Sequence, residues 1–297
     1  MPCASHAVVR ACPPRAVAEL GIEVMICNAY HLWQRPGADI VDAMGGLHSY
    51  MSWPAALMTD SGGFQAFSIG GNSGISEEGF AFRSHLSGEL LHLTPEVCMQ
   101  VQTRLGSDVA MVLDECVAYP AEEEYVADSV ARTARWALRC RQAHGREDQA
   151  LFGIVQGGMY LDLRRQSAQV LADMDFPGYG IGGLSVGEPK ELMYEMLEGM
   201  MDIMPRHKPR YLMGVGSPDC LVEGVLRGID MFDCVLQTRV ARNGLAMTRQ
   251  GKKMLRNSEF ERDFSPIEEG CGCYACQNFT RAYIRHLIKA KEILAAQ

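Results

Sequence analysis

The sequence contains no run of about 18 uncharged apolar residues, the length that a membrane-spanning helix needs. Its first residues, MPCASHAVVRACPP, contain no apolar segment ahead of a cleavage site, so no secretory signal is predicted. We therefore expect a cytoplasmic protein with no membrane partner. Of the 297 residues, 47% are hydrophobic and 22% are charged, which excludes a fibrous or disordered chain and indicates a globular one.

The sequence also has no overall excess of basic residues. Its 28 Lys and Arg face 36 Asp and Glu, a net charge of −8, whereas a nucleic-acid partner favours positive charge. The charge is unevenly distributed, however, because residues 1–233 carry a net −13 and residues 234–297 carry a net +5. The basic segment is either a solvated surface or a phosphate-binding face, and charge alone does not decide between them.

Eleven cysteines in a chain of this kind indicate free thiols and a metal site more than a disulfide framework. Three of them, Cys271, Cys273 and Cys276, lie within six residues, a spacing typical of zinc ligands. Reactive or incidental thiols are the alternative. A structural zinc takes four ligands, and His286, on a helix predicted over residues 279–295, fits a dimer-facing role at least as well. We predict a zinc site with these three ligands and no identified fourth.

Short apolar runs alternate with amphipathic stretches of helical period along most of the chain. The strand-type runs are residues 22–27, 56–59, 108–113, 150–155, 179–184, 210–215 and 231–236, and the helical stretches include 95–105, 122–143, 161–174 and 190–204. This alternation predicts a parallel sheet, and its length favours a (βα)8 TIM barrel over an open sheet. The eighth strand would have to include Met1 and Pro2. We divide the chain into a barrel over 1–248 and a basic, zinc-binding subdomain with a C-terminal helix over 249–297.

Polar loops follow four of these apolar runs. They are DSGGFQ at residues 60–65, DEC at 114–116, QGG at 156–158 and GGLSVGE at 182–188. A barrel carries its chemistry on the loops after the carboxyl ends of its strands, so these four should share one mouth. Each alone is more often a turn than a site. Together they suit the edge of a purine, with Asp114 accepting from N–H donors, Gln156 donating to a carbonyl and backbone amides near Gly183 completing the set.

One further carboxylate, Asp233, lies in MFDCVLQTRVARNG, where apolar sequence gives way to cationic sequence. An acid in that position is either paired or catalytic. Composition alone favours pairing with Arg239 or Arg242, because buried charges usually persist by pairing.

Eleven motifs occur along the chain in the order NAYHL, TDSGGFQ, SEEG, SHLSGE, GSD, DEC, QGG, GGLSVGE, PRYLMGVG, GIDMFDCV and RNG. In these motifs, their order and their approximate spacing, the chain resembles the tRNA-guanine transglycosylases over nearly its full length. The phrase FDCVLQTR is similar to the family signature FDCV-x-PTR, with Gln237 where the family usually has Pro. That change affects the rigidity of the loop more than its chemistry. Compared with the family, we expect the N-terminal hairpin and the C-terminal end to be shortened.

The resemblance implies a role for each candidate residue. Asp233 would be the nucleophile that takes the ribose from a departing base, and Asp60 the general acid and base. Other implied roles are base binding by Asp114, Gln156, Gly183 and Leu184, stacking on the base by Phe64 and Met213, support by Ser61, Asn28 and Gln65, and anticodon binding by Arg239 and Arg242. The implied partners are tRNA with a GUN anticodon, a 7-deazaguanine base and a second copy of the chain in a homodimer.

The identity of the incoming base depends on the GGLSVGE loop. Family members of bacterial type accept 7-aminomethyl-7-deazaguanine, whereas eukaryotic ones accept queuine, whose cyclopentenediol needs a smaller residue in this loop. Val186 and Cys116 match the bacterial type, and forcing a bulky ring against a valine costs about 1–3 kcal/mol. We expect the aminomethyl base, with its ammonium group received by the Leu184 carbonyl or by Glu188. A queuine-inserting enzyme is the alternative.

Two other classes of protein are alternatives to such an enzyme. A non-catalytic partner subunit that keeps the fold and binds RNA would be expected to lose the nucleophile or the purine-reading groups, but Asp60, Asp114, Gln156 and Asp233 are all present. A zinc-dependent barrel hydrolase would need catalytic histidines at strand ends, and the four loops contain none. The sequence therefore favours a base-exchange enzyme acting on tRNA.

Overall fold

The computed structural model describes residues 1–70 and 74–297, and an eight-stranded parallel sheet is its main feature. In order around the sheet, the strands are β1 (Cys3–Ala4), β2 (Val24–Cys27), β3 (Ala56–Thr59), β7 (Val109–Met111), β8 (Ala150–Val155), β9 (Gly178–Ile181), β10 (Arg210–Leu212) and β11 (Met231–Phe232). A parallel bridge between Pro2 and Cys234 joins the last strand to the first. The Met1 amino group also donates to the Phe232 carbonyl at 2.7 Å. The predicted TIM-type barrel is confirmed, and its eighth strand involves the first residues of the chain.

Five of the strands (β2, β7, β9, β10 and β11) are shorter than the apolar runs that predicted them, whereas β3 and β8 have the predicted bounds. Parallel strands in a barrel are covered on both faces, so they are apolar throughout, and β8 and β9 are buried along almost their whole length. Val112 and Leu113 are also fully buried but belong to no strand, because the chain leaves the sheet there to form the loop that carries Asp114. The end of this apolar run thus forms part of the loop that carries Asp114 and not of the sheet.

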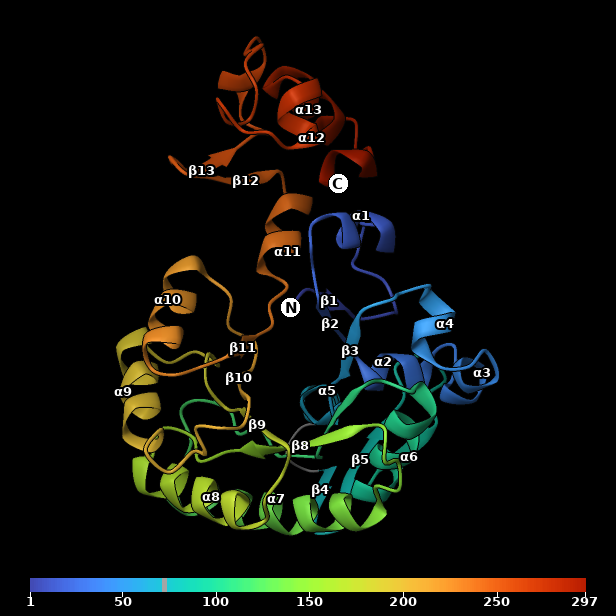
Figure 1. The fold of residues 1–297 in the computed structure, drawn as a ribbon, viewed down its shortest axis with the longest axis vertical. Coiled ribbons are helices and arrows are strands. Elements are labelled where there is room, and N and C mark those ends of the chain that lie inside the picture. Colours follow the sequence, from blue (N-terminus) through green and yellow to red (C-terminus); the bar gives the residue numbers. More distant parts are fainter. Residues whose placement is uncertain (71–73) are drawn as a thin grey trace.

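Helices surround the ring of strands (Figure 1). They are α1 (Pro14–Glu19), α2 (Ala29–Gln34), α3 (Ala38–Ala43), α4 (Leu47–Met51), α5 (Gly63–Gly70), α6 (Pro95–Leu105), α7 (Glu123–Ala143), α8 (Leu161–Asp173), α9 (Lys190–Met200) and α10 (Pro218–Leu226). A further helix, α11 (Leu236–Arg242), leads from β11 towards the C-terminal residues. Helix α6 shows how the sequence sets their limits. The Thr94 side chain caps its first turn by accepting from Val97 N, and Gly106 ends it in a left-handed conformation. Among the described helices, none has the length and apolar composition that crossing a bilayer requires.

An antiparallel sheet is inserted between β3 and β7. It consists of β4 (Ile75–Ser76), β5 (Gly79–Arg83) and β6 (Leu90–Leu93). Its buried residues Phe80, Phe82 and Leu93 join the main hydrophobic core of the barrel. The alternation of strands and helices in the sequence did not predict this insertion.

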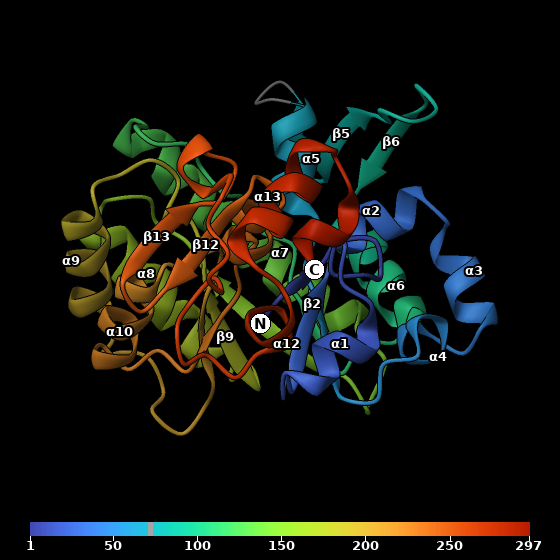
Figure 2. The same ribbon diagram turned by 90° about the horizontal axis from the view of Figure 1, so that it is seen from above.

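The residues after α11 form a separate lobe beside the barrel. Its elements are β12 (Leu245–Thr248), β13 (Gly251–Met254), the short 3-10 turns η2 (Ser258–Phe260) and η3 (Ile293–Ala296), α12 (Tyr274–Asn278) and α13 (Arg281–Lys289). Leu255, Phe260 and Ile284 give the lobe a small hydrophobic core of its own. Figure 1 shows the lobe projecting from the side of the ring where β1 and β11 meet, and Figure 2 shows the same lobe from above.

Two details of the lobe differ from the expectation. The predicted C-terminal helix ends at Lys289, and Lys291 turns the chain with a φ of 60° before η3. We predicted the boundary between the two units at residues 248 and 249. These residues lie where β12 ends and the turn to β13 begins, and the two strands pair with each other. We propose that the second unit begins with β12.

Candidate active site

Asp60 follows β3 directly and is held by the neighbouring loop after β2. Its Oδ1 accepts from Ala29 N at 2.9 Å, and its Oδ2 accepts from Asn28 Nδ2 at 2.5 Å. Asn28 is itself fixed, because its Oδ1 caps α2 by accepting from His31 N at 2.9 Å. Asn28 therefore holds Asp60 in place, and its implied support role in catalysis stays a prediction.

The environment of Asp60 favours a proton on its carboxyl group. The side chain is half-buried, and burial is the largest influence that raises its pKa, to about 7. The Ala29 amide opposes this shift, while the negative charges of Asp233 and Asp114 add to it. Asp60 can therefore hold or release a proton near neutral pH, as a general acid and base must.

Asp114, Gln156 and Ser61 form one buried polar group beside Asp60. Asp114 is 5% exposed; its Oδ1 accepts from Ser61 Oγ at 3.0 Å and its Oδ2 accepts from Gln156 Nε2 at 2.6 Å. Burial raises the pKa of Asp114 to about 6, against the opposing effect of the bonds from Gln156 and Ser61. The structure therefore brings together three predicted site residues from the loops after β3, β7 and β8.

Gly182 and Gly183, after β9, lie directly against the Gln156 carboxamide. A Cβ on Gly182 would lie 2.5 Å from Gln156 Nε2, and one on Gly183 would lie 2.3 Å from Gln156 Oε1. Gly183 also has a φ of 63°, in the left-handed region that favours glycine. The two glycines are therefore needed for the loop to approach the group that the sequence predicts will read a purine.

Asp233 follows β11 and accepts hydrogen bonds on both carboxylate oxygens. Oδ1 accepts from Tyr211 OH at 2.5 Å and from Gly214 N at 2.7 Å, and Oδ2 accepts from the Cys3 thiol at 3.3 Å. Among the described residues, no Lys or Arg forms a salt bridge with Asp233, so the structure does not support the paired, structural alternative. Tyr211, Gly214 and Cys3 were not predicted as site residues.

A cavity of about 400 Å³ lies next to Asp233. Its lining includes Ser185 and Glu188 from the loop after β9, Gly214 from the loop after β10, and Arg239 from α11. The nucleophile candidate and a cation thus face one opening that could receive a ribose and its phosphate. Gln237, on the same helix, donates to the Gly216 carbonyl at 2.7 Å and so fixes the start of α11 to the loop after β10.

The arginines of α11 form a positive cluster, and neither of them forms a salt bridge within residues 1–70 and 74–297. Arg239 is exposed, and Arg242 has a buried Nη1 that contacts no hydrogen-bond acceptor in the described part of the chain. Burial lowers the pKa of Arg242, and the positive charges of Arg10 and Arg239 lower it further. Such a cluster is suited to bind an anion.

The remaining base-site candidates lie around the same mouth. Leu184 is buried, Val186 and Met213 are half-buried, and Phe64, at the start of α5, is 54% exposed. Stacking on a base by Phe64 and Met213 stays a prediction.

The loop after β9 is held in shape by its own acid. Glu188 accepts hydrogen bonds from the backbone amides of Ser185 and Val186, and Ser185 has a φ of 60°. Glu188 therefore already binds this loop through both carboxylate oxygens.

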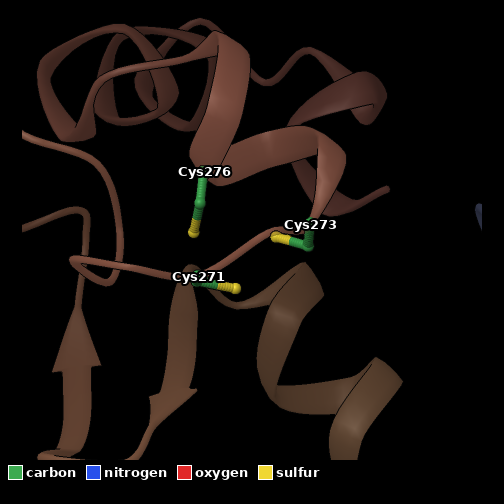
Figure 3. Close-up of side chains that lie close together, drawn as sticks. All are labelled: Cys271, Cys273 and Cys276. Atoms are coloured by element: carbon green, nitrogen blue, oxygen red, sulfur yellow. The ribbon is translucent and has the colours of Figure 1, made fainter.

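The three clustered cysteines converge in the lobe (Figure 3). Their sulfur atoms all lie within 4.8 Å of one another, an arrangement that a metal ion can bind. His286 on α13 is not part of this group. All eleven cysteines are free thiols, as predicted. Three converging thiols fit three corners of a tetrahedral zinc site.

The fold and the site together define a class of enzyme. A parallel barrel whose mouth holds one protonatable carboxyl, one hydrogen-bonded carboxylate and a polar edge suited to a purine is equipped to act at a glycosidic bond.

Comparisons with known proteins give the family. The family model described as "Queuine tRNA-ribosyltransferase" matches residues 1–297. Relatives with the name "Queuine tRNA-ribosyltransferase" include proteins of Pelotomaculum thermopropionicum (60% identical over 99% of this chain and 80% of the relative), Moorella thermoacetica (60%, over 99% and 79%) and Halothermothrix orenii (54%, over 100% and 80%). The chain belongs to the queuine tRNA-ribosyltransferase family.

Proposed function

We propose that this protein exchanges the wobble guanine of GUN-anticodon tRNAs for 7-aminomethyl-7-deazaguanine, as a tRNA-guanine transglycosylase of bacterial type in queuosine biosynthesis. The observation that carries this proposal is the contrast between Asp60 and Asp233. The first is placed to hold a proton near neutral pH, and the second accepts hydrogen bonds from Tyr211 OH, Gly214 N and the Cys3 thiol. One enzyme with two such acids can both protonate a leaving base and attack the sugar it leaves.

In the first half of the reaction, Asp233 attacks C1′ of the wobble nucleotide. The C1′–N9 bond breaks as the C1′–oxygen bond to Asp233 forms, and the electron pair of the broken bond leaves with guanine. Asp60 donates a proton to the departing base. Positive charge develops on the ribose in the transition state, so a carboxylate on the opposite face stabilises it before trapping it.

In the second half, the incoming base displaces Asp233. Its N9 gives up a proton to Asp60 and attacks C1′, which releases the carboxylate and restores the starting protonation of both acids. Two inversions give net retention at C1′. The tRNA stays covalently attached to the protein between the two steps, so the polynucleotide is not lost while the bases exchange.

Asp114, Gln156, Gly183 and Leu184 would hold the base, with Ser61 orienting Asp114 through the bond between Ser61 Oγ and Asp114 Oδ1. The Asp114 carboxyl accepts from the ring and exocyclic N–H groups of a purine, and the amide of Gly183 donates to its carbonyl oxygen. Because Gln156 Nε2 already donates to Asp114 at 2.6 Å, its second N–H is the one available to the base.

The choice of incoming base would depend on Val186. Val186 lines a cavity of about 250 Å³ together with Gly183, Met159 and Tyr160. We propose that Val186 excludes the cyclopentenediol of queuine. The Leu184 carbonyl would receive the ammonium group of the smaller base, since Glu188 already accepts from two backbone amides.

Arg239 and Arg242 would bind the anticodon backbone, and Arg10 adds positive charge to the same cluster. Zinc would bind Cys271, Cys273 and Cys276 and stabilise the lobe. The proposed assembly is a homodimer, and the proposed place of action is the cytoplasm.

The proposal is tested by incubating the protein with GUN-anticodon tRNA and labelled guanine. Wild-type protein should transfer label to tRNA, whereas the Asp233→Asn and Asp60→Asn variants should not. Asp202→Asn is a matched control, because Asp202 pairs with Arg165 on an exposed outer face of the barrel. No incorporation by wild-type protein, or full incorporation by either active-site variant, would contradict the proposal.

A further inference from the structure

Arg164 is a fully buried cation on α8. Its exposed fraction is 0%, and within the described residues it forms no salt bridge. A buried charge is costly unless it is compensated, so its position calls for a physical explanation.

Backbone carbonyls provide the compensation. Arg164 Nε donates to the Gly158 carbonyl at 2.7 Å, Nη1 and Nη2 both donate to the Gly182 carbonyl at 3.1 Å, and Nη2 also donates to the Gly183 carbonyl at 3.0 Å. The contact is close, because a Cβ on Gly157 would lie 2.6 Å from Arg164 Cγ. One guanidinium therefore joins the loop that follows Gln156 to the loop that carries Gly183.

The acceptors matter because of the peptide groups to which they belong. The Gly182 carbonyl shares a peptide with the Gly183 N–H, and the Gly183 carbonyl shares one with the Leu184 N–H. Donation from a cation to a carbonyl polarises the whole peptide and makes its N–H a stronger donor. Burial lowers the pKa of Arg164 to about 10, so the side chain stays positively charged at neutral pH.

We propose that Arg164 is a positioning residue for the leaving base: through the Gly182–Gly183 and Gly183–Leu184 peptides it orients and strengthens the N–H donors that receive the purine carbonyl oxygen. This inference rests on the proposed function. When the C1′–N9 bond breaks, its electron pair moves into the guanine ring and negative charge spreads onto the 6-oxygen. Stronger donors at that oxygen stabilise the departing base, while the proton still comes from Asp60.

The test compares unlabelled guanine and 6-thioguanine as competitive inhibitors of the incorporation of labelled guanine into tRNA. Guanine presents an oxygen acceptor at position 6, whereas 6-thioguanine keeps the same N–H donors but presents sulfur, a weak acceptor. In Arg164→Met, the inhibition constant of guanine should rise about tenfold, because a polarised donor has been weakened. That of 6-thioguanine should change much less, so the ratio of the two constants should move towards one.

A merely structural role for Arg164 predicts a different result. If the substitution only loosens the loops, both bases lose affinity equally and the ratio stays at its wild-type value, which would overturn the proposal, as would unchanged inhibition by guanine. Arg164→Lys keeps the charge but not the forked geometry, so it should show a smaller shift of the ratio, and it decides the question if Arg164→Met does not fold. Failure of wild-type protein to exchange guanine would instead refute the proposed function.

Discussion

Replacing Asp60 with Asn should change how the stability of the protein depends on pH. The pKa of Asp60 is about 7 in the folded protein, against 3.8 for an ordinary Asp, so the folded state binds this proton more tightly than the unfolded state does. The free energy of unfolding of the wild type must therefore fall as pH rises from about 4 to about 7. An Asn side chain does not titrate, so the variant loses this source of pH dependence.

The structure sets the size of the effect. A shift of about three units corresponds to roughly 4 kcal/mol, and partial contact with solvent reduces this to about 2 kcal/mol for a half-buried side chain. At pH 5, Asp60→Asn should be less stable than wild type by about 1 kcal/mol, because an amide nitrogen replaces one of the two carboxyl oxygens that accept from Asn28 Nδ2 and Ala29 N. At pH 8.5 the difference should have closed, because about two of the three units lie above pH 5 and cost the wild type roughly 1.3 kcal/mol that the variant does not lose.

Urea denaturation at pH 5 and pH 8.5 measures both values. Asp202→Asn is the control, because the bond from Arg165 keeps the pKa of Asp202 below its usual range, so that carboxylate stays charged across the whole interval. Parallel pH dependence of wild type and Asp60→Asn would refute the reasoning about the Asp60 proton.

Three further predictions concern binding, metal and specificity. The double variant Arg239→Ala, Arg242→Ala should bind tRNA more weakly, with a shallower salt dependence at stated ionic strengths; unchanged affinity and slope would remove these arginines from the RNA site. Elemental analysis should find about one zinc per chain, removed by chelators more readily than from a closed four-ligand site, and Cys276→Ser should lower the content; metal-free protein purified without chelators would contradict the zinc assignment. Val186→Gly should raise kcat/KM for queuine relative to the aminomethyl base, whereas a wild-type preference for queuine would overturn the assigned base.

Much of the barrel could be predicted because its strands are buried on both faces. Residues 150–155 and 56–59 read as uninterrupted apolar runs and form β8 and β3 over the same bounds. The inserted sheet escaped prediction because β4 is two residues long and its neighbours depend on pairing with one another. The C-terminal helix was predicted too long because its apolar pattern continues past Lys291, where the backbone turns.

The site residues that could be predicted lie where a strand ends in a polar loop. Asp60, Asp114 and Gln156 have this signal, and the structure brings them together. Cys3 reads as part of an apolar segment and meets Asp233 only because the barrel closes. Arg164 has the spacing of a surface residue on an amphipathic helix, and only the packing of α8 against the loops shows that it is buried.

The central claim is that Asp233 forms a covalent bond to the ribose of the wobble nucleotide. It is tested most directly by mixing the protein with GUN-anticodon tRNA, quenching with denaturant and separating the products on a denaturing gel. Wild-type protein should give a band that contains both protein and RNA, which peptide mapping assigns to Asp233, and Asp233→Asn should give none. A denaturation-resistant adduct in Asp233→Asn, or one mapped to another residue of the wild type, would contradict the account.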